Sequence, residues 1–442
     1  MPDEDLATPG PAAGSRTTSA APPADGPGRP DPHPAGDAPE ADSRPAPRWL
    51  AGVVMAGLVL AALNLRPAIT SLGPLMKEVR EGLGMSATVA GLVTSVPAVC
   101  FAVFGIAAPR LARRWGPGAI VCAGMVAIAV GVAVRPFTGG TAGFLAASML
   151  ALAGIAVSNV LMPVVIKSWF PDRVGPMTGL YSMALALGTS LAAAVTVPLT
   201  AALGGGWQLG LAVWAAVAVV AVLPWLAVVR QRRATPGPAV GGPASPGAAP
   251  IRIASSPTAW ALAVFFGLQA TAAYVTMGWM PQIFRDAGVS AGTAGVLLAI
   301  TMAMGVPLSF VMPWLASRLR HQGPLVAVLG LCGVAGYTGL WLAPAAGSWA
   351  WVLLMGISNC AFPLALTMIG MRAGSAAGVV KLSAFVQSVG YLISVPGPLL
   401  VGALYQHSGG WGLPIAMMAG LMVPQIVAGV LAGRDRRIED ER

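Results

Sequence analysis

The chain has 442 residues, of which 56% are hydrophobic and only 10% are charged, and its formal net charge is +10. A water-soluble domain carries about 25% charged residues, so this composition excludes an ordinary soluble protein and indicates many membrane spans. Basic residues in short loops orient membrane proteins, so the positive charge does not indicate a nucleic-acid partner. The four cysteines lie in apolar runs without metal-ligand spacing, and we expect buried thiols, no metal and no cofactor.

Residues 1–47 contain mainly Pro, Ala, Gly, Asp and Ser, and such a segment cannot bury a core, so we expect a disordered tail. Apolar runs of about 20 residues follow, each long enough to cross a bilayer as a helix. The first six lie near 49–74, 86–108, 118–136, 141–166, 176–200 and 207–229. The second six lie near 258–283, 291–316, 324–343, 348–370, 379–404 and 411–432.

A stretch rich in Pro, Gly and Ala separates the two sets of runs and is typical of a flexible linker. The sequence therefore predicts an all-α membrane protein with twelve transmembrane helices in two six-helix bundles. The predicted parts are the tail 1–47, the first bundle 48–229, the linker 230–257, the second bundle 258–432 and the C-terminal tail 433–442.

Lysine and arginine are distributed unequally between the two sides of the predicted bundles. The loops after spans 2, 4, 6, 8 and 10, together with the C-terminal tail, hold 17 of them. The opposite loops hold four, namely Lys77, Arg80, Arg135 and Arg285. The positive-inside rule then predicts a protein of the plasma (inner) membrane with both termini in the cytoplasm.

The two sets of runs repeat short motifs in the same order. "SNVLMP" at 158–163 returns as "SNCAFP" at 358–363, and "PRLARR" at 109–114 returns as "PWLASR" at 313–318. The matches have offsets of 200 and 204 residues and fall at equivalent spans. Duplicated six-helix halves are a design of secondary transporters, in which the solute is held near the midplane between the halves.

The segment "LARRWGP" at 111–117 resembles the signature loop of the major facilitator superfamily, commonly L-A-D-R-x-G-R. Arg114 and Gly116 match it, whereas Arg113 stands at the usual Asp, and we hypothesise that Asp172 of the next loop on that side offers a substitute partner. The residues expected to form the signature loop and its cytoplasmic gate are Arg113, Arg114, Gly116, Asp172 and Arg318.

Longer segments resemble one branch of that superfamily, the cyanate / 2-nitroimidazole porter (CynX/NimT) family. They are "NLRPAITSLGPL" at 64–75, 90–116, 268–295 and 383–404, and the resemblance extends from about 48 to 432. It implies the two pseudo-symmetric bundles of the superfamily, a central cavity lined by spans 1, 4, 7 and 10, and a small solute such as cyanate, a carboxylate or a nitroimidazole. The glycine-rich fifth-helix motif of drug/proton antiporters is not evident in this sequence.

Arg66 lies inside the first apolar run. A continuous helix of 17 residues from Trp49 rises about 26 Å, which places Arg66 past the midplane. An arginine at that depth costs at least about 2.5–3.5 kcal/mol, so it faces a water-filled cavity or a partner, or it snorkels to the interface. No carboxylate lies at the centre of a predicted span, and we therefore favour the cavity, where a guanidinium offers two parallel donors to an anion.

Three neighbours of Arg66 bear on the same cavity. Pro67 removes a backbone donor and is expected to loosen the helix there. Thr70 lies four residues on and shares the face of Arg66, whereas Asn64 faces another side of a regular helix. Pro97, Pro307 and Pro396 are expected to bend helices and not to bind solute.

The remaining polar candidates lie on spans 4, 7, 10 and 11. Asn159 and Asn359 each precede a proline by four residues, and each either contacts solute or bonds to a neighbouring helix or to a carbonyl freed by the proline. Gln387 and Tyr391 lie on one helical face. The predicted substrate-binding residues are Arg66, Asn64, Thr70, Asn159, Gln269, Tyr274, Asn359, Gln387 and Tyr391.

The sequence favours a secondary or facilitative transporter of a small anionic or polar organic solute that works by alternating access. An exporter of drugs or metabolites from the same superfamily is the first alternative, although a cation-binding cavity normally needs an intramembrane acid. A membrane-embedded enzyme and a receptor are remote, because the spans contain no catalytic base and the chain has no sizeable soluble domain. We expect a small-molecule substrate, the lipid bilayer as partner and a functional monomer. Coupling runs through the solute's own proton or is absent, and Glu78 and Asp286 are weaker relay candidates.

Overall fold

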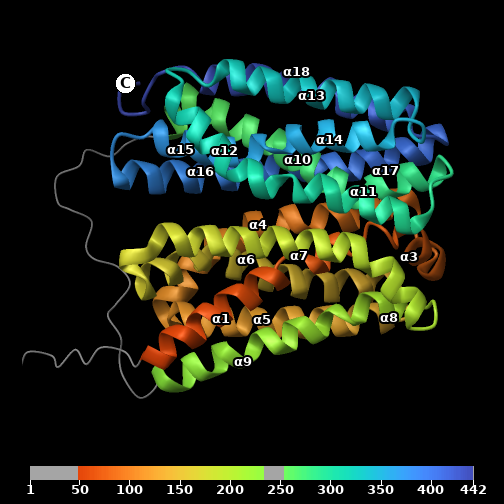
Figure 1. Cartoon of the computed structure of the whole chain (residues 1–442), viewed down its shortest axis with the longest axis horizontal. Helices are drawn as coiled ribbons and strands as arrows, with labels where there is room; N and C mark the ends of the chain where they lie inside the picture. The colour runs from red at the N-terminus through yellow and green to blue at the C-terminus, as the bar shows by residue number, and fades with distance from the viewer. Residues whose placement is uncertain (1–47, 233–252, 442) are drawn as a thin grey trace, which may run out of the picture. The chain divides into compact units, whose positions relative to one another are not determined.

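The computed structural model describes residues 48–232 and 253–441 (Figure 1). Every regular element in these residues is helical, and twelve helices are long and apolar enough to cross a membrane. The predicted fold class is therefore confirmed. The predicted tail 1–47, most of the predicted linker and the last residue lie outside the described residues.

The first half comprises residues 48–232 and contains six of the spans. Its elements are α1 (Arg48–Asn64), α2 (Pro67–Thr70), α3 (Met76–Leu83), α4 (Ala87–Trp115), α5 (Pro117–Val134), η1 (Arg135–Phe137), α6 (Thr141–Trp169), η2 (Pro171–Arg173), α7 (Val174–Ala202), α8 (Trp207–Ala212) and α9 (Trp214–Arg232). The short amphipathic helix α3 is an element that hydropathy alone did not predict.

The second half comprises residues 253–441 and contains the other six spans. Its elements are η3 (Ile253–Ser255), α10 (Pro257–Asp286), α11 (Ala291–Ala303), α12 (Gly305–Arg318), α13 (Gly323–Leu342), α14 (Ser348–Asn359), α15 (Ala361–Met371), α16 (Ala376–Ser394), α17 (Pro396–Ser408) and α18 (Gly412–Ala432). In Figure 1 this half is coloured green to blue.

Several spans are broken in two, and prolines account for most of the breaks. A proline cannot donate to the carbonyl four residues earlier. Accordingly, α11 ends four residues before Pro307 and α14 ends four residues before Pro363. Pro396 begins α17, whereas Pro97 lies inside α4, which continues through it without a break.

The duplicated halves share one close helix contact. A Cβ added to Gly124 of α5 would lie 2.4 Å from the Oγ of Ser158 on α6. A Cβ added to Gly333 of α13 would lie 2.6 Å from the Oγ of Ser358 on α14. Only glycine permits helices to approach this closely, so the repeated "SN" motif is packed in the same way in both halves.

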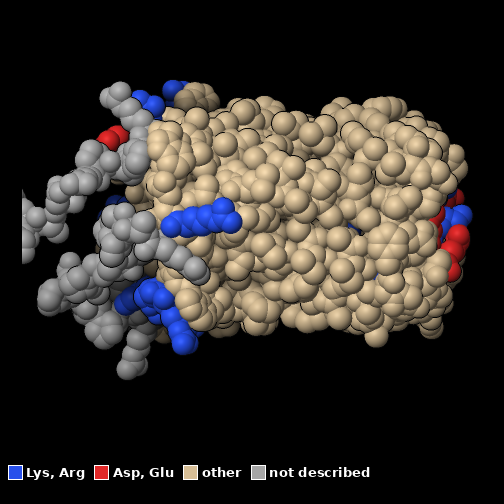
Figure 2. All heavy atoms as spheres, turned by 90° about the horizontal axis from the view of Figure 1, so that it is seen from below, with Lys and Arg blue, Asp and Glu red and all other residues tan. Residues whose placement is uncertain are grey.

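The spans have a tail end, where the described chain begins with Arg48 and where α18 ends, and an opposite distal end, which carries α3 (Figure 1). Charged side chains gather at these two ends in Figure 2, and a broad band between them is almost free of charge. Lysine and arginine dominate the tail end in this view, whereas the distal end shows acidic and basic side chains together. This distribution suits helices that cross a bilayer.

Glycines bring the two halves into contact toward the distal end. A Cβ on Gly402 of α17 would lie 2.2 Å from the carbonyl oxygen of Ala87, at the start of α4. A Cβ on Gly295 of α11 would lie 2.6 Å from the carbonyl oxygen of Ala193 on α7. The backbones of the two halves therefore touch at two places related by the duplication.

Polar bonds also join the halves at the distal end. Arg285 at the end of α10 donates to both carboxylate oxygens of Glu78 on α3, at 2.6 and 2.9 Å, and to the carbonyl of Pro74 at 2.9 Å. Thr88 donates to the Oε1 of Gln406 from its hydroxyl at 2.8 Å. These side-chain hydrogen bonds and the ion pair, which join the two halves between described residues, all lie at the distal end.

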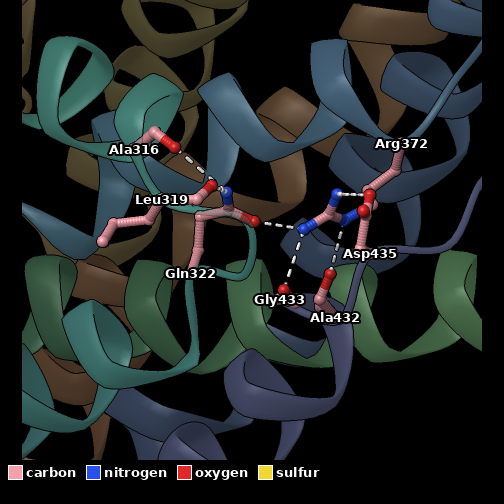
Figure 3. Close-up of polar contacts among 7 residues, drawn as sticks. All are labelled: Ala316, Leu319, Gln322, Arg372, Ala432, Gly433 and Asp435. Carbon is pink, nitrogen blue, oxygen red and sulfur yellow. Dashed lines mark hydrogen bonds and ion pairs between the residues drawn. The ribbon is translucent and has the colours of Figure 1, made fainter.

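At the tail end of the second half, Arg372 joins three chain segments (Figure 3). Its side chain is only 2% exposed, and it donates to the carbonyls of Ala432 and Gly433 at 2.9 Å each and to the Oε1 of Gln322. Gln322 in turn donates to the carbonyls of Ala316 and Leu319. These bonds fix the ends of α12, α15 and α18, and α15 continues the span that carries Asn359.

We predict that Arg372→Ala lowers the free energy of unfolding by about 3 kcal/mol or more, because each buried group left unpaired costs about 1–3 kcal/mol. The measurement is thermal unfolding of the purified protein in detergent, with Arg434→Ala, an exposed arginine nearby, as the matched control. An Arg372→Ala protein as stable as the control would show that this network does not hold the helices.

Candidate functional site

The first span is broken beside Arg66. Helix α1 ends at Asn64 and α2 begins at Pro67, and Arg66 caps α2 with φ −118° and ψ −28°. The hydroxyl and the backbone N–H of Thr70 both donate to the carbonyl of Arg66, at 3.1 and 3.0 Å. The loosening of the helix predicted at Pro67 is therefore confirmed. Thr70 bonds to the backbone carbonyl of Arg66 and not to its side chain.

The half-buried side chain of Arg66 lies where the two halves meet. Its Cζ is 6.0 Å from the centre of the Phe101 ring on α4. Tyr181 on α7, Tyr274 on α10 and Tyr391 on α16 lie within electrostatic range of its charge. Two of these aromatic residues belong to the first half and two to the second, so Arg66 is bordered by both.

This environment bears on the three explanations of Arg66 that the sequence allowed. Within the described part of the chain Arg66 makes no ion pair, so a structural carboxylate partner is not found there. Phe101, Tyr274 and Tyr391 lie well inside their spans, so Arg66 is not placed among the helix ends, as snorkelling would require. A partly exposed and unpaired cation at depth fits a solvent-accessible space between the halves.

Tyr391 is the centre of an aromatic wall beside Arg66. Its ring stacks on Phe101 with 5.1 Å between centroids and meets Phe266 edge to face at 5.2 Å. Gln387, one turn before Tyr391, donates to the Oγ of Ser383 at 2.7 Å. Tyr391 thus lies at the site, whereas the amide of Gln387 is engaged along its own helix.

The two repeated asparagines lie in different networks. The Oδ1 of Asn159 accepts a hydrogen bond from the hydroxyl of Tyr181, which places Asn159 one residue away from Arg66. The Nε2 of Gln269 donates to Asn359, at 2.7 Å to its Oδ1 and 3.3 Å to its backbone carbonyl. Pro363 cannot donate to that carbonyl, so Gln269 satisfies a group that the break exposes.

The Gln269 network stays within the second half. Gln269 also accepts from the Nε2 of Gln425 at 3.0 Å, and with Asn359 it lines a small cavity that includes Tyr337. No hydrogen bond or ion pair between described residues connects this network to Arg66. The structure therefore brings Gln269 and Asn359 together, but in a cavity separate from the Arg66 group.

Asn64 points away from Arg66, as its spacing indicated. Its side chain is 2% exposed, and its Nδ2 donates to the Sδ of Met125 on α5 at 3.9 Å. It packs into the first half and is not part of the junction between the halves.

The signature loop is exposed at the tail end. Gly116, with φ +82°, ends α4 in the left-handed region that favours glycine. Arg114 lies over Trp115 at 4.9 Å, and Arg318 lies over Trp314 at 3.9 Å. Among the described residues no ion pair joins Asp172 to Arg113 or Arg114 in this conformation, and all three side chains are exposed.

A second arginine, Arg135, departs from its expected place. The sequence assigned it to a loop, whereas the structure buries it in η1 with 2% exposure. Its Nη1 donates to the carbonyl of Ala68 on α2 at 2.8 Å. Arg135 therefore supports the broken segment that carries Arg66, and its signal in the sequence was the same Arg-Pro pair that occurs at 66–67.

Comparison with known proteins identifies the family. The chain matches the sequence model of the Major Facilitator Superfamily over residues 54–395. It is 35% identical to the Uncharacterized transporter YycB of Bacillus subtilis (strain 168), with 88% of this chain and 94% of that protein aligned. It is 32% identical to the 2-nitroimidazole transporter of Escherichia coli (strain K12), over 87% and 96% of the two chains. It is 33% identical to the Cyanate transport protein CynX of the same organism, over 83% and 94%.

The fold has solved counterparts. One is the crystal structure of a bacterial homolog to the human lysosomal transporter Spinster, in an inward-facing and unoccupied conformation. It superposes with a TM-score of 0.68 and 17% identity, covering 90% of this chain and 99% of that one. The relatives and the family are transporters and not enzymes. The chain is thus a multi-pass membrane transporter that belongs to the major facilitator superfamily and, within it, to the cyanate / 2-nitroimidazole porter (CynX/NimT) family.

Proposed function

We propose that this transporter moves a small anionic or polar organic solute and that Arg66 binds the solute's acceptor atoms. One observation carries the proposal: Arg66 is half-buried, makes no ion pair among described residues and is bordered by both halves. A permanently charged group in that position gains most from an anion that enters between the halves.

The neighbours of Arg66 favour a flat solute. Guanidinium offers two parallel N–H donors, which match the two oxygens of a carboxylate or of a nitro group. The stacked rings of Phe101 and Tyr391 present an apolar wall to a planar body, while the hydroxyls of Tyr181 and Tyr274 offer further hydrogen bonds. Relatives named for cyanate and 2-nitroimidazole support this solute class, because both compounds carry acceptor atoms on a small linear or planar frame.

The pathway follows from the distal fastening. With the halves joined at the distal end, solute reaches Arg66 from the tail end. The excess of Lys and Arg at the tail end predicts that this end faces the cytoplasm. Rocking of the halves about Arg66 breaks the Glu78–Arg285 latch and opens the distal end. We place no carboxylate relay at the site, so coupling runs through the solute's own proton or is absent. The signature-loop residues at the tail end form the opposite gate in this scheme.

We predict that Arg66→Gln reduces uptake of labelled cyanate, benzoate and 2-nitroimidazole into proteoliposomes by at least about tenfold, since a charge-assisted pair is worth roughly 1.5–3 kcal/mol. Arg66→Lys keeps the charge but removes the two parallel N–H donors of the guanidinium. We expect this variant to lose more uptake of benzoate than of cyanate. Arg434→Gln, a change at an exposed arginine of the C-terminal tail, is the control.

Thermal unfolding must show that both Arg66 variants are folded. Normal uptake of all three compounds by Arg66→Gln would remove the proposed role of this residue. Loss of uptake in both Arg66 variants and in the control would point to a general defect and not to a binding site.

The latch predicts a second behaviour. Burial raises the pKa of Glu78, but the hydrogen bonds and charge of Arg285 outweigh it, so the pKa lies below its ordinary value. Because the pKa of Glu78 is lowered in the folded protein, its ion pair with Arg285 is fully formed above the pKa that Glu78 has in the unfolded chain. The ion pair is lost as the pH falls through the lower pKa of the folded protein. The Glu78 side chain is 36% exposed, so we expect the pair to contribute no more than about 1 kcal/mol.

We therefore predict that Glu78→Gln, which mimics the protonated form, opens the distal end in a larger fraction of molecules at neutral pH, by roughly up to fivefold. Spin labels on cysteines at Leu209 and Leu413, which are 47% and 50% exposed at that end, report the distance in a background without the native cysteines. Glu81→Gln, an exposed neighbouring carboxylate, is the control. Identical distance distributions in both variants would mean that the latch does not hold this end.

A further inference from the structure

Arg135 lines a cavity between the two halves on the distal side of the Arg66 group. The cavity is narrow, and its walls come from the first span, α4, η1, α6 and α10. Thr94 and Ser148 line it from the first half, and Tyr274 and Gly278 line it from the second. Along α4, Thr94 precedes Phe101 and lies nearer the distal end, so the cavity lies farther along the path than Arg66.

One edge of the Arg135 guanidinium is unoccupied. Its Nη1 donates to the carbonyl of Ala68, but its Nε and Nη2 are buried and have no hydrogen-bond partner among the described residues. In a planar guanidinium the N–H bonds of Nε and Nη2 lie parallel on the same edge, which is the edge that a carboxylate approaches with two oxygens. The hydroxyl of Ser148, buried on the same cavity, also lacks a partner among those residues.

The charge of Arg135 is uncompensated as well. None of the residues that line the cavity is acidic, and the ring of Phe144, 5.8 Å from the Cζ, supplies only a weak cation–π attraction. An arginine that is 98% buried with two free donors costs several kcal/mol unless a counter-charge or water satisfies it. The free edge and the charge together select an anion over a neutral ligand.

Two contacts connect this cavity to Arg66. Tyr274 lines the cavity and also interacts with Arg66. Ala68, which Arg135 holds, belongs to the α2 turn that Arg66 caps. A solute that leaves Arg66 toward the distal end therefore meets Arg135 after passing one tyrosine.

We propose that Arg135 and Ser148 form a second binding site for a small carboxylate or cyanate-like anion, distal to Arg66 and separated from it by Tyr274. The inference rests on the proposed function and extends it: the solute occupies the two arginines in succession. The narrow space suits an anion of a few atoms, or the carboxylate of a larger solute whose body stays near Arg66.

The test is the number of anions bound to purified protein, measured by isothermal titration with sodium cyanate and with sodium acetate. Wild type should bind two anions, and Arg66→Gln should retain one. Arg135→Gln should also retain one, and the Arg66→Gln/Arg135→Gln protein should bind none. Uptake by Arg135→Gln should fall at least tenfold.

Arg135 also supports α2, so Ser148→Ala supplies a variant that leaves the bond to Ala68 intact. Loss of one hydrogen bond should weaken anion binding in the Arg66→Gln background about three- to tenfold. Ser168→Ala, which removes the hydroxyl of an exposed serine at the tail end of the same helix α6, is the control.

Failure of this inference is distinguishable from failure of the proposed function. The Arg135 site is overturned if wild type binds one anion, Arg66→Gln binds none and Ser148→Ala has no effect. The proposed role of Arg66 then stands, and water satisfies the free donors of Arg135. Normal uptake and binding by Arg66→Gln overturns the proposed function instead.

Discussion

The structure depends on one electrostatic constraint, a guanidinium held inside the membrane without a carboxylate partner among the described residues. The break at Pro67 removes Arg66 from a regular helix and places it between the two halves. Its neighbours are aromatic rings and phenolic hydroxyls. These groups attract the guanidinium only weakly, so its N–H donors stay available for a solute. A site of this kind is incomplete without an anion or water, and this incompleteness is what we expect a transporter to use.

The two halves are alike in packing but differ in chemistry. Gly124 against Ser158 and Gly333 against Ser358 repeat one helix contact. The asparagines that follow have diverged: Asn159 joins a tyrosine beside Arg66, whereas Asn359 is held by Gln269 in its own half. The half-buried Arg66 and the buried Arg135, which both lie near the junction, come from the first half. The first half therefore supplies the positive charge, and the second supplies aromatic walls and hydroxyl groups.

Hydropathy and charge predicted most of the fold. Ten of the twelve spans were placed within four residues of their observed bounds, whereas the second span ends seven residues later and the eighth span eight residues earlier than predicted. The neighbours of Arg66 were harder to predict. Phe101 and Tyr181 look like ordinary apolar residues, because only the packing of α4 and α7 turns them toward Arg66. Arg135 was counted as a loop residue because its apolar run ends there. Its side chain is buried because α2 and α6 pack around it, and this tertiary packing cannot be read from the local sequence. The partner of Asp172 also stays a hypothesis, since the sequence does not determine how two exposed loops approach each other.

The most direct test of the account is the distance between the Arg66 guanidinium and a bound anion in a bilayer. Solid-state NMR with ¹⁵N-labelled arginine and ¹³C-carboxyl benzoate measures it by dipolar recoupling, and the Arg66→Lys protein identifies the signal. We predict a carbon–nitrogen distance of about 4 Å that disappears in Arg66→Lys, as a bidentate pair requires. Benzoate that binds with no recoupling to Arg66, or that gives the same signal in Arg66→Lys, would contradict the account.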